Sequence, residues 1–168
     1  MIPLLLEQLR TERVLRVYFS MPFGHLPQVK EVLNKDIYPK FRGTCKARGV
    51  TFVPVDFRQD RFPNIVPSPD LITVLLEDLV RSRPFFVGIF GESFDPTLPF
   101  IPQEIPSRFP SCGELKNPSL VDLEVKIAIL SKPASHDEAI FYFLAEDGAQ
   151  PCGCPDWKKE VRVAGVHI

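Results

Sequence analysis

The chain has 168 residues, a length that fits one domain and suffices to bury a substantial hydrophobic core. Its 20 basic and 21 acidic residues leave a net charge of -1, which offers no field to attract nucleic acid or an anionic lipid surface. Without a secretory signal, the four cysteines predict free thiols, and Cys152 and Cys154 lack the further ligands of a zinc site. We expect a cytoplasmic protein with no metal and no membrane-spanning segment.

The first third of the chain predicts a strand and a helix. Residues 14–20 are β-branched and aromatic and end just before a proline, as a strand does. From Val29 to Cys45, apolar residues recur at three- and four-residue steps, which indicates an amphipathic helix lying on a sheet. Pro39 inside this pattern should kink or split the helix. Gly49 stands where a left-handed cap belongs.

A second strand and a second helix follow. Residues 51–56 predict the strand, and Pro54, which has no N–H to donate, fits an edge position. Ser68 before a proline has the pattern of a helix N-cap. The helix should end before Pro84, with a buried stripe formed by Leu71, Val74, Leu75 and Leu79.

The second half predicts two more strands. Residues 85–90 are almost continuously apolar, which is typical of a central strand covered by helices on both faces. Residues 91–117 hold five prolines and predict a long loop, either functional or loosely ordered. A third helix should open near Asn117, with an apolar face of Leu120, Leu123, Ile127 and Leu130. Residues 139–144 predict the fourth strand, and residues 161–166 are the next candidate.

Strands therefore alternate with helices along the chain. This alternation predicts a three-layer α/β domain with a mostly parallel sheet of about four or five strands. We divide the chain into an N-terminal extension (residues 1–13), the α/β domain (residues 14–146) and a poorly structured tail (residues 147–168).

Several of these segments carry a resemblance to a known family. In order, they are residues 17–23, 38–50, 52–58, 76–92 and 119–125. They resemble the TIR-like domain of unknown function at the N-terminus of animal and bacterial proteins that continue into a NACHT-type ATPase and TPR or WD repeats. The resemblance covers about residues 13–144 and implies a TIR-like, flavodoxin-like fold. It also makes Pro39 and Pro54 look like family features.

The chain departs from this family at two polar positions and at its end. Members usually carry an acidic residue shortly after the first strand, where this chain has residues 21–25, and a Trp-Gly pair where it has Gln59 and Asp60. The edge of the sheet at the strand ends therefore lacks polar residues that family members usually carry there. Beyond Leu144 there is no resemblance, so the ending looks foreign, as from truncation or an alternative exon.

The candidate site residues lie where the strands end. In doubly wound sheets, ligands bind at the carboxyl ends of the strands. The candidate ligand-binding residues there are Ser20, Asp56, Arg58, Gly91 and Glu92. The resemblance to TIR-type NAD glycohydrolases implies that Glu124 would stabilise the cationic ribosyl centre as nicotinamide leaves.

Each candidate also has a structural interpretation. Glu124 and its neighbour Asp122 stand near a helix start, where the helix dipole favours acidic residues. Asp56 and Arg58 at the end of a strand have the pattern of a surface ion pair. Arg81 and Arg83 have the pattern of a solvated helix end.

We therefore weigh three functions. The leading hypothesis is a non-catalytic interaction module without a cofactor, the N-terminal part of a larger signalling or scaffold protein, which contacts like domains or partner proteins. The second is an enzyme that cleaves NAD, its substrate, through Glu124. The third is a truncated product without independent function. Release of nicotinamide from NAD separates the first two.

Overall fold

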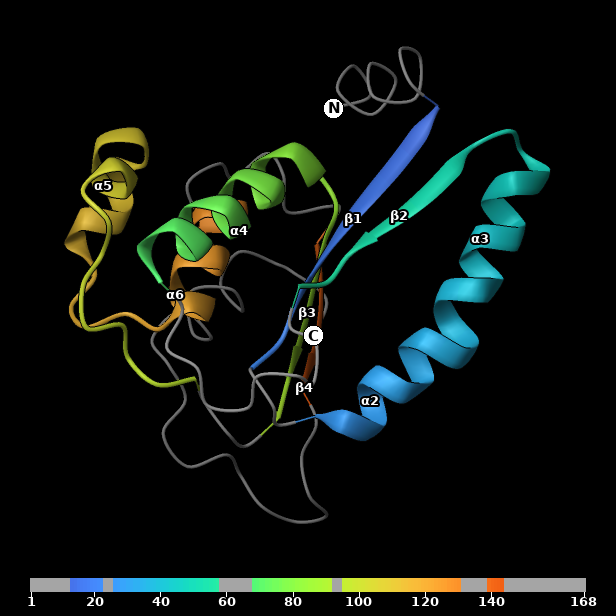
Figure 1. Cartoon of the computed structure of the whole chain (residues 1–168), viewed down its shortest axis with the longest axis horizontal. Coiled ribbons are helices and arrows are strands. Elements are labelled where there is room, and N and C mark those ends of the chain that lie inside the picture. Colours follow the sequence, from blue (N-terminus) through green and yellow to red (C-terminus); the bar gives the residue numbers. More distant parts are fainter. Residues whose placement is uncertain (1–12, 23–25, 58–67, 92–94, 131–138, 144–168) are drawn as a thin grey trace.

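The computed structural model describes residues 13–22, 26–57, 68–91, 95–130 and 139–143. Its centre is a sheet of four parallel strands: β1 (Val14–Ser20), β2 (Thr51–Val55), β3 (Phe86–Phe90) and β4 (Ala139–Phe143). The strand order is β2-β1-β3-β4. Helices lie on both sides of this sheet (Figure 1), so the expected three-layer α/β architecture is confirmed. No helix in the described ranges is long and apolar enough to cross a membrane.

A continuous helical run covers one face of the sheet beside β1 and β2 (Figure 1). It consists of α2 (Pro27–Val32), a π-helical turn η1 (Leu33–Ile37) and α3 (Tyr38–Ala47). Pro39 cannot donate the backbone bond that an α-helix requires, and the wider turn directly before it accommodates this loss. The run ends at Gly49 with φ of 69°, where the N–H groups of Gly49 and Val50 donate to Lys46 and Cys45. The glycine cap is confirmed as a Schellman motif.

Helix α4 (Pro69–Ser82) lies on the opposite face, and its N-cap is as expected. The Ser68 hydroxyl accepts a hydrogen bond from the Leu71 N–H at 3.3 Å. Two of the four residues predicted to form the buried stripe are in fact exposed, Leu71 by 39% and Val74 by 49%. Leucines follow one another so closely here that two stripes satisfy the helical period. The sheet selects the one formed by Ile72, Leu75, Leu76 and Leu79.

The predicted long loop contains two short helical elements. These are α5 (Glu104–Arg108) and a 3-10 helix η2 (Pro110–Glu114), and they bury Ile105 and Cys112 in the core. Helix α6 (Leu120–Val125) follows, with a π-helical extension η3 (Lys126–Leu130). Its N-cap is Ser119, two residues after the predicted start.

β3 is an interior strand, as its apolar sequence predicts, but its two faces differ. Phe86 is buried against α4 and α6, together with Phe141 from β4. Val87 points to the other face, beside α2 and α3, and is only half-buried. The expectation that helices cover this strand on both faces is therefore met only in part at Val87. β2 is an edge strand, which explains how Pro54 is tolerated.

Candidate functional site

A fully buried polar cluster in the described core joins α6 to β1. Both carboxylate oxygens of Glu124 accept hydrogen bonds, one from the Tyr18 hydroxyl at 2.8 Å and one from the Ser20 hydroxyl at 2.5 Å. Glu124 and Ser20 are 0% exposed and Tyr18 is 2% exposed. Two of the predicted site residues, Ser20 and Glu124, are thus in direct contact. Their position beside β1 and β3 is where the strand order reverses.

Local sequence explains how these three side chains meet. Tyr18 and Ser20 are two residues apart on a strand, so they point to the same face. Helix α6 is fixed at its start by a capping box, in which the Asp122 carboxylate accepts from the Ser119 N–H at 2.7 Å. The reciprocal bond runs from the Asp122 N–H to the Ser119 hydroxyl at 3.2 Å. Asp122 therefore caps the helix that carries Glu124, as its structural interpretation expects.

Tyr18 was missed in the sequence analysis because its aromatic ring fits a core position. The ring does stack on Phe86, with 6.1 Å between centroids, while the hydroxyl reaches Glu124. The two-residue spacing from Ser20 was the available signal. The three groups together orient the carboxylate tightly, and the burial of all three separates it from solvent.

Asp56 lies on the other side of the sheet from Glu124. It follows β2 and accepts a hydrogen bond from the hydroxyl of Tyr38, on α3, at 3.4 Å. Burial, together with the negative charge of Asp56, raises the pKa of Tyr38 well above its ordinary value. The structure therefore does not bring Asp56 together with Ser20 and Glu124. Arg58 and Glu92 lie outside the described residues, and Gly91, at the end of β3, is partly exposed.

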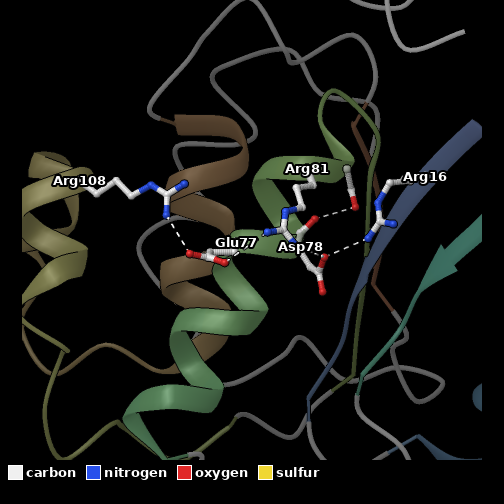
Figure 2. A network of polar contacts seen from close by, with 6 residues as sticks. Arg16, Glu77, Asp78, Arg81 and Arg108 are labelled. Atoms are coloured by element: carbon white, nitrogen blue, oxygen red, sulfur yellow. Dashed lines mark hydrogen bonds and ion pairs between the residues drawn. The ribbon is translucent and has the colours of Figure 1, made fainter. Parts of the chain in front are cut away.

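A second polar network that the sequence did not predict links three elements on the α4 side (Figure 2). Arg16 on β1 contacts Asp78 at 3.0 Å, and Arg81 lies 3.6 Å from both Asp78 and Glu77. Arg108 on α5 contacts Glu77 at 3.4 Å. Arg81 was expected to be a solvated helix end, but it bridges two carboxylates while staying exposed. Such partly exposed ion pairs position neighbouring elements and add little stability each.

Arg83 directly follows α4, and its side chain also forms a hydrogen bond. Its guanidinium donates a hydrogen bond to the carbonyl oxygen of Ile127, and burial lowers its pKa from the ordinary value.

Within the described ranges, no group of three His, Cys, Asp or Glu side chains is placed to hold a metal ion.

The chain is similar to part of one much longer protein. It is 22% identical, over 145 residues, to a TPR repeat-containing protein of Dictyostelium discoideum. The match takes in 79% of this chain but 9% of that protein, so the chain spans about a tenth of its length. No family model and no solved structure matches the chain.

Proposed function

We propose that this chain is a non-catalytic protein–protein interaction module within a larger signalling or scaffold protein. The similarity to a TPR repeat-containing protein supports this, because the matched segment there belongs to a much longer chain. We also propose that the larger protein continues into NACHT, TPR or WD-repeat regions. This part of the proposal depends on the sequence resemblance alone. We also propose that the protein is cytoplasmic.

The proposal that the module is non-catalytic depends on one observation, the burial and hydrogen bonding of the Glu124 carboxylate. A catalytic carboxylate must reach its substrate, yet this one is 0% exposed and both of its oxygens accept hydrogen bonds from the chain itself. Its geometry is that of a cross-link between α6 and β1. A buried carboxylate held in this way specifies how two elements pack.

The NAD-cleaving alternative has one observation in its favour. Ser20 and Glu124 lie together at the reversal of strand order, the place where sheets of this kind bind ligands. A role of Glu124 in cleavage requires an opening that exposes it. The catalytic role of Glu124 and the binding roles of Asp56, Arg58 and Glu92 therefore stay predictions.

Incubation of the purified chain with NAD, followed by detection of nicotinamide, tests the choice. We expect no release above that of buffer. The matched pair of variants is Glu124→Gln, which removes the carboxylate, and Tyr18→Phe, which removes one of its hydrogen bonds but keeps the carboxylate. Nicotinamide release that persists in Tyr18→Phe and disappears in Glu124→Gln would overturn the non-catalytic proposal.

The interaction itself is expected to use helix α4. Leu71 and Val74 stand three residues apart on its exposed side and are 39% and 49% exposed. We expect sedimentation velocity to show association that increases with protein concentration. Replacing both residues with lysine should leave a folded monomer, because charged side chains are unfavourable in an apolar contact. A wild-type chain that stays monomeric at every concentration would contradict contacts between like domains through α4.

A further inference from the structure

Helix α3 is exposed on nearly every side. Of its ten residues, Tyr38 is fully buried and Cys45 is partly buried, and the other eight are exposed. The helix lies at the β2 side of the sheet, away from α4, α5 and α6 (Figure 1). Contact with another domain is one setting in which a helix with so little buried surface is stable.

The exposed surface of α3 is basic. Its cations are Lys40, Arg42, Lys46 and, at the C-terminal cap, Arg48, and the helix has no acidic residue. Within the part of the chain that the structure describes, none of the four forms an ion pair, unlike the arginines around α4. The helix dipole accounts for Lys46 and Arg48 in the last turn, but not for Lys40 and Arg42. Arg42 and Lys46 stand four residues apart, and like charges at this spacing destabilise a helix unless an anion lies nearby.

An apolar hollow of about 340 Å³ opens beside this helix. Ile37 and Phe41 line it from the helical run, and Ile140 and Tyr142 line it from β4. Phe41 is 51% exposed, Ile140 is 47% exposed and Tyr142 is 54% exposed. Lys40 comes three residues after Ile37, so the two are neighbours on the helix surface. An unpaired cation therefore stands next to the apolar lining.

We propose that α3 and the hollow together bind an acidic segment of a partner protein that carries a large apolar side chain. Carboxylates of the segment contact the cations of α3, and its apolar side chain occupies the hollow. A cavity of about 150 Å³ accommodates benzene, so the hollow has room for an aromatic side chain. Nucleic acid and anionic lipid fit less well, because the net charge of the whole chain is -1. This inference rests on the proposed interaction function and names the chemistry of the partner.

Fluorescence anisotropy with labelled peptides tests the proposal. The probe is a short peptide of glutamates with one central phenylalanine, and the comparison probe has serine in place of the phenylalanine. We expect the phenylalanine probe to bind more tightly than the serine probe, and less tightly as salt is added. Lys40→Glu should weaken binding at least about tenfold, because it places like charges opposite one another. The matched control, Lys116→Glu, makes the same change of charge at an exposed position after η2 and should leave binding unchanged.

Ile140→Ser tests the hollow separately from the charges. It removes an apolar side chain from the lining at a position that is 47% exposed. It should weaken binding of the phenylalanine probe and leave binding of the serine probe unchanged. Circular dichroism establishes that each variant is folded. If Ile140→Ser does not fold, Phe41→Ser makes the same test from the helical side of the hollow.

Three results would overturn the proposal. The first is failure of the phenylalanine probe to bind, or equal affinity for the two probes or for Lys40→Glu and the wild type. The second is an oligonucleotide or a phosphatidylserine vesicle that binds as tightly as the peptide and loses affinity in Lys40→Glu. The third is self-association of the chain that Lys40→Glu abolishes, because it would assign α3 to a second copy. None of them touches the non-catalytic proposal, which nicotinamide release decides.

Discussion

Replacing Glu124 by leucine is the sharpest test of the cross-link between α6 and β1. The substitution keeps the side chain's bulk but leaves the hydroxyls of Tyr18 and Ser20 buried without the carboxylate. A buried hydroxyl without its partner costs about 1–3 kcal/mol. Two of them, partly offset by the relief of burying a carboxylate, give an expected loss of about 2–4 kcal/mol. This is a large part of the roughly 5–15 kcal/mol that holds a domain of this size together.

Urea unfolding followed by circular dichroism measures this loss. With a slope of about 2 kcal/mol per molar urea, the midpoint should fall by about 1–2 M. The control is a double-mutant cycle with Tyr18→Phe, which removes one of the two stranded hydroxyls in advance. In that background Glu124→Leu should cost at least about 1 kcal/mol less. An unchanged or raised midpoint in Glu124→Leu, or a coupling near zero, would refute the cross-link.

Two further predictions concern a glycine and a tyrosine. A Cβ on Gly88 would lie 2.6 Å and 2.9 Å from two core phenylalanine rings, so Gly88→Ala should lower the free energy of unfolding by about 1–3 kcal/mol in urea titrations. A loss below a few tenths would contradict the tight packing. Tyr38 keeps its proton more strongly in the folded chain than when unfolded, so stability should fall as the pH rises above about 10, the unfolded pKa. Urea midpoints should fall less steeply over that range in Tyr38→Phe, and equal slopes would contradict the raised pKa.

The fold was largely readable from the sequence because its strands are strongly marked. Runs of β-branched and aromatic residues identified all four strands of the described sheet to within one residue at each end. The signal for a helix start at Ser68 and the signal for a helix end at Gly49 were equally local, since each depends on a backbone position that few residues satisfy. The sequence did not show which of two apolar stripes on α4 faces the sheet, because both fit the helical period equally well. Leu71 and Val74 match the helical period as well as the residues that are buried, and only the position of the sheet decides between them.

The candidate site was harder to predict because its contacts join distant parts of the chain. Ser20 was a candidate because of the general position of ligand sites in parallel sheets, and Glu124 was one because of the family resemblance. Their burial did not follow, since it depends on how closely α6 packs on β1. Tyr18 carries both a core ring and a buried hydroxyl, and the sequence revealed the first alone. Asp56 was grouped with Ser20 because both end strands, but Asp56 points to the other face, toward α3.

The strand order also determines when the protein can complete its core during synthesis. β1 is made first and pairs with β2 some forty residues later, so the first strand–helix–strand unit can form early. Its pairing with β3 must wait longer, because Tyr18 lies opposite Phe86. The hydrogen bond from Tyr18 to Glu124 joins residues that are 106 positions apart in the chain, so it cannot form before α6 has been synthesised. Until α6 has been synthesised, the hydroxyls of Tyr18 and Ser20 lack the carboxylate to which they donate in the folded chain.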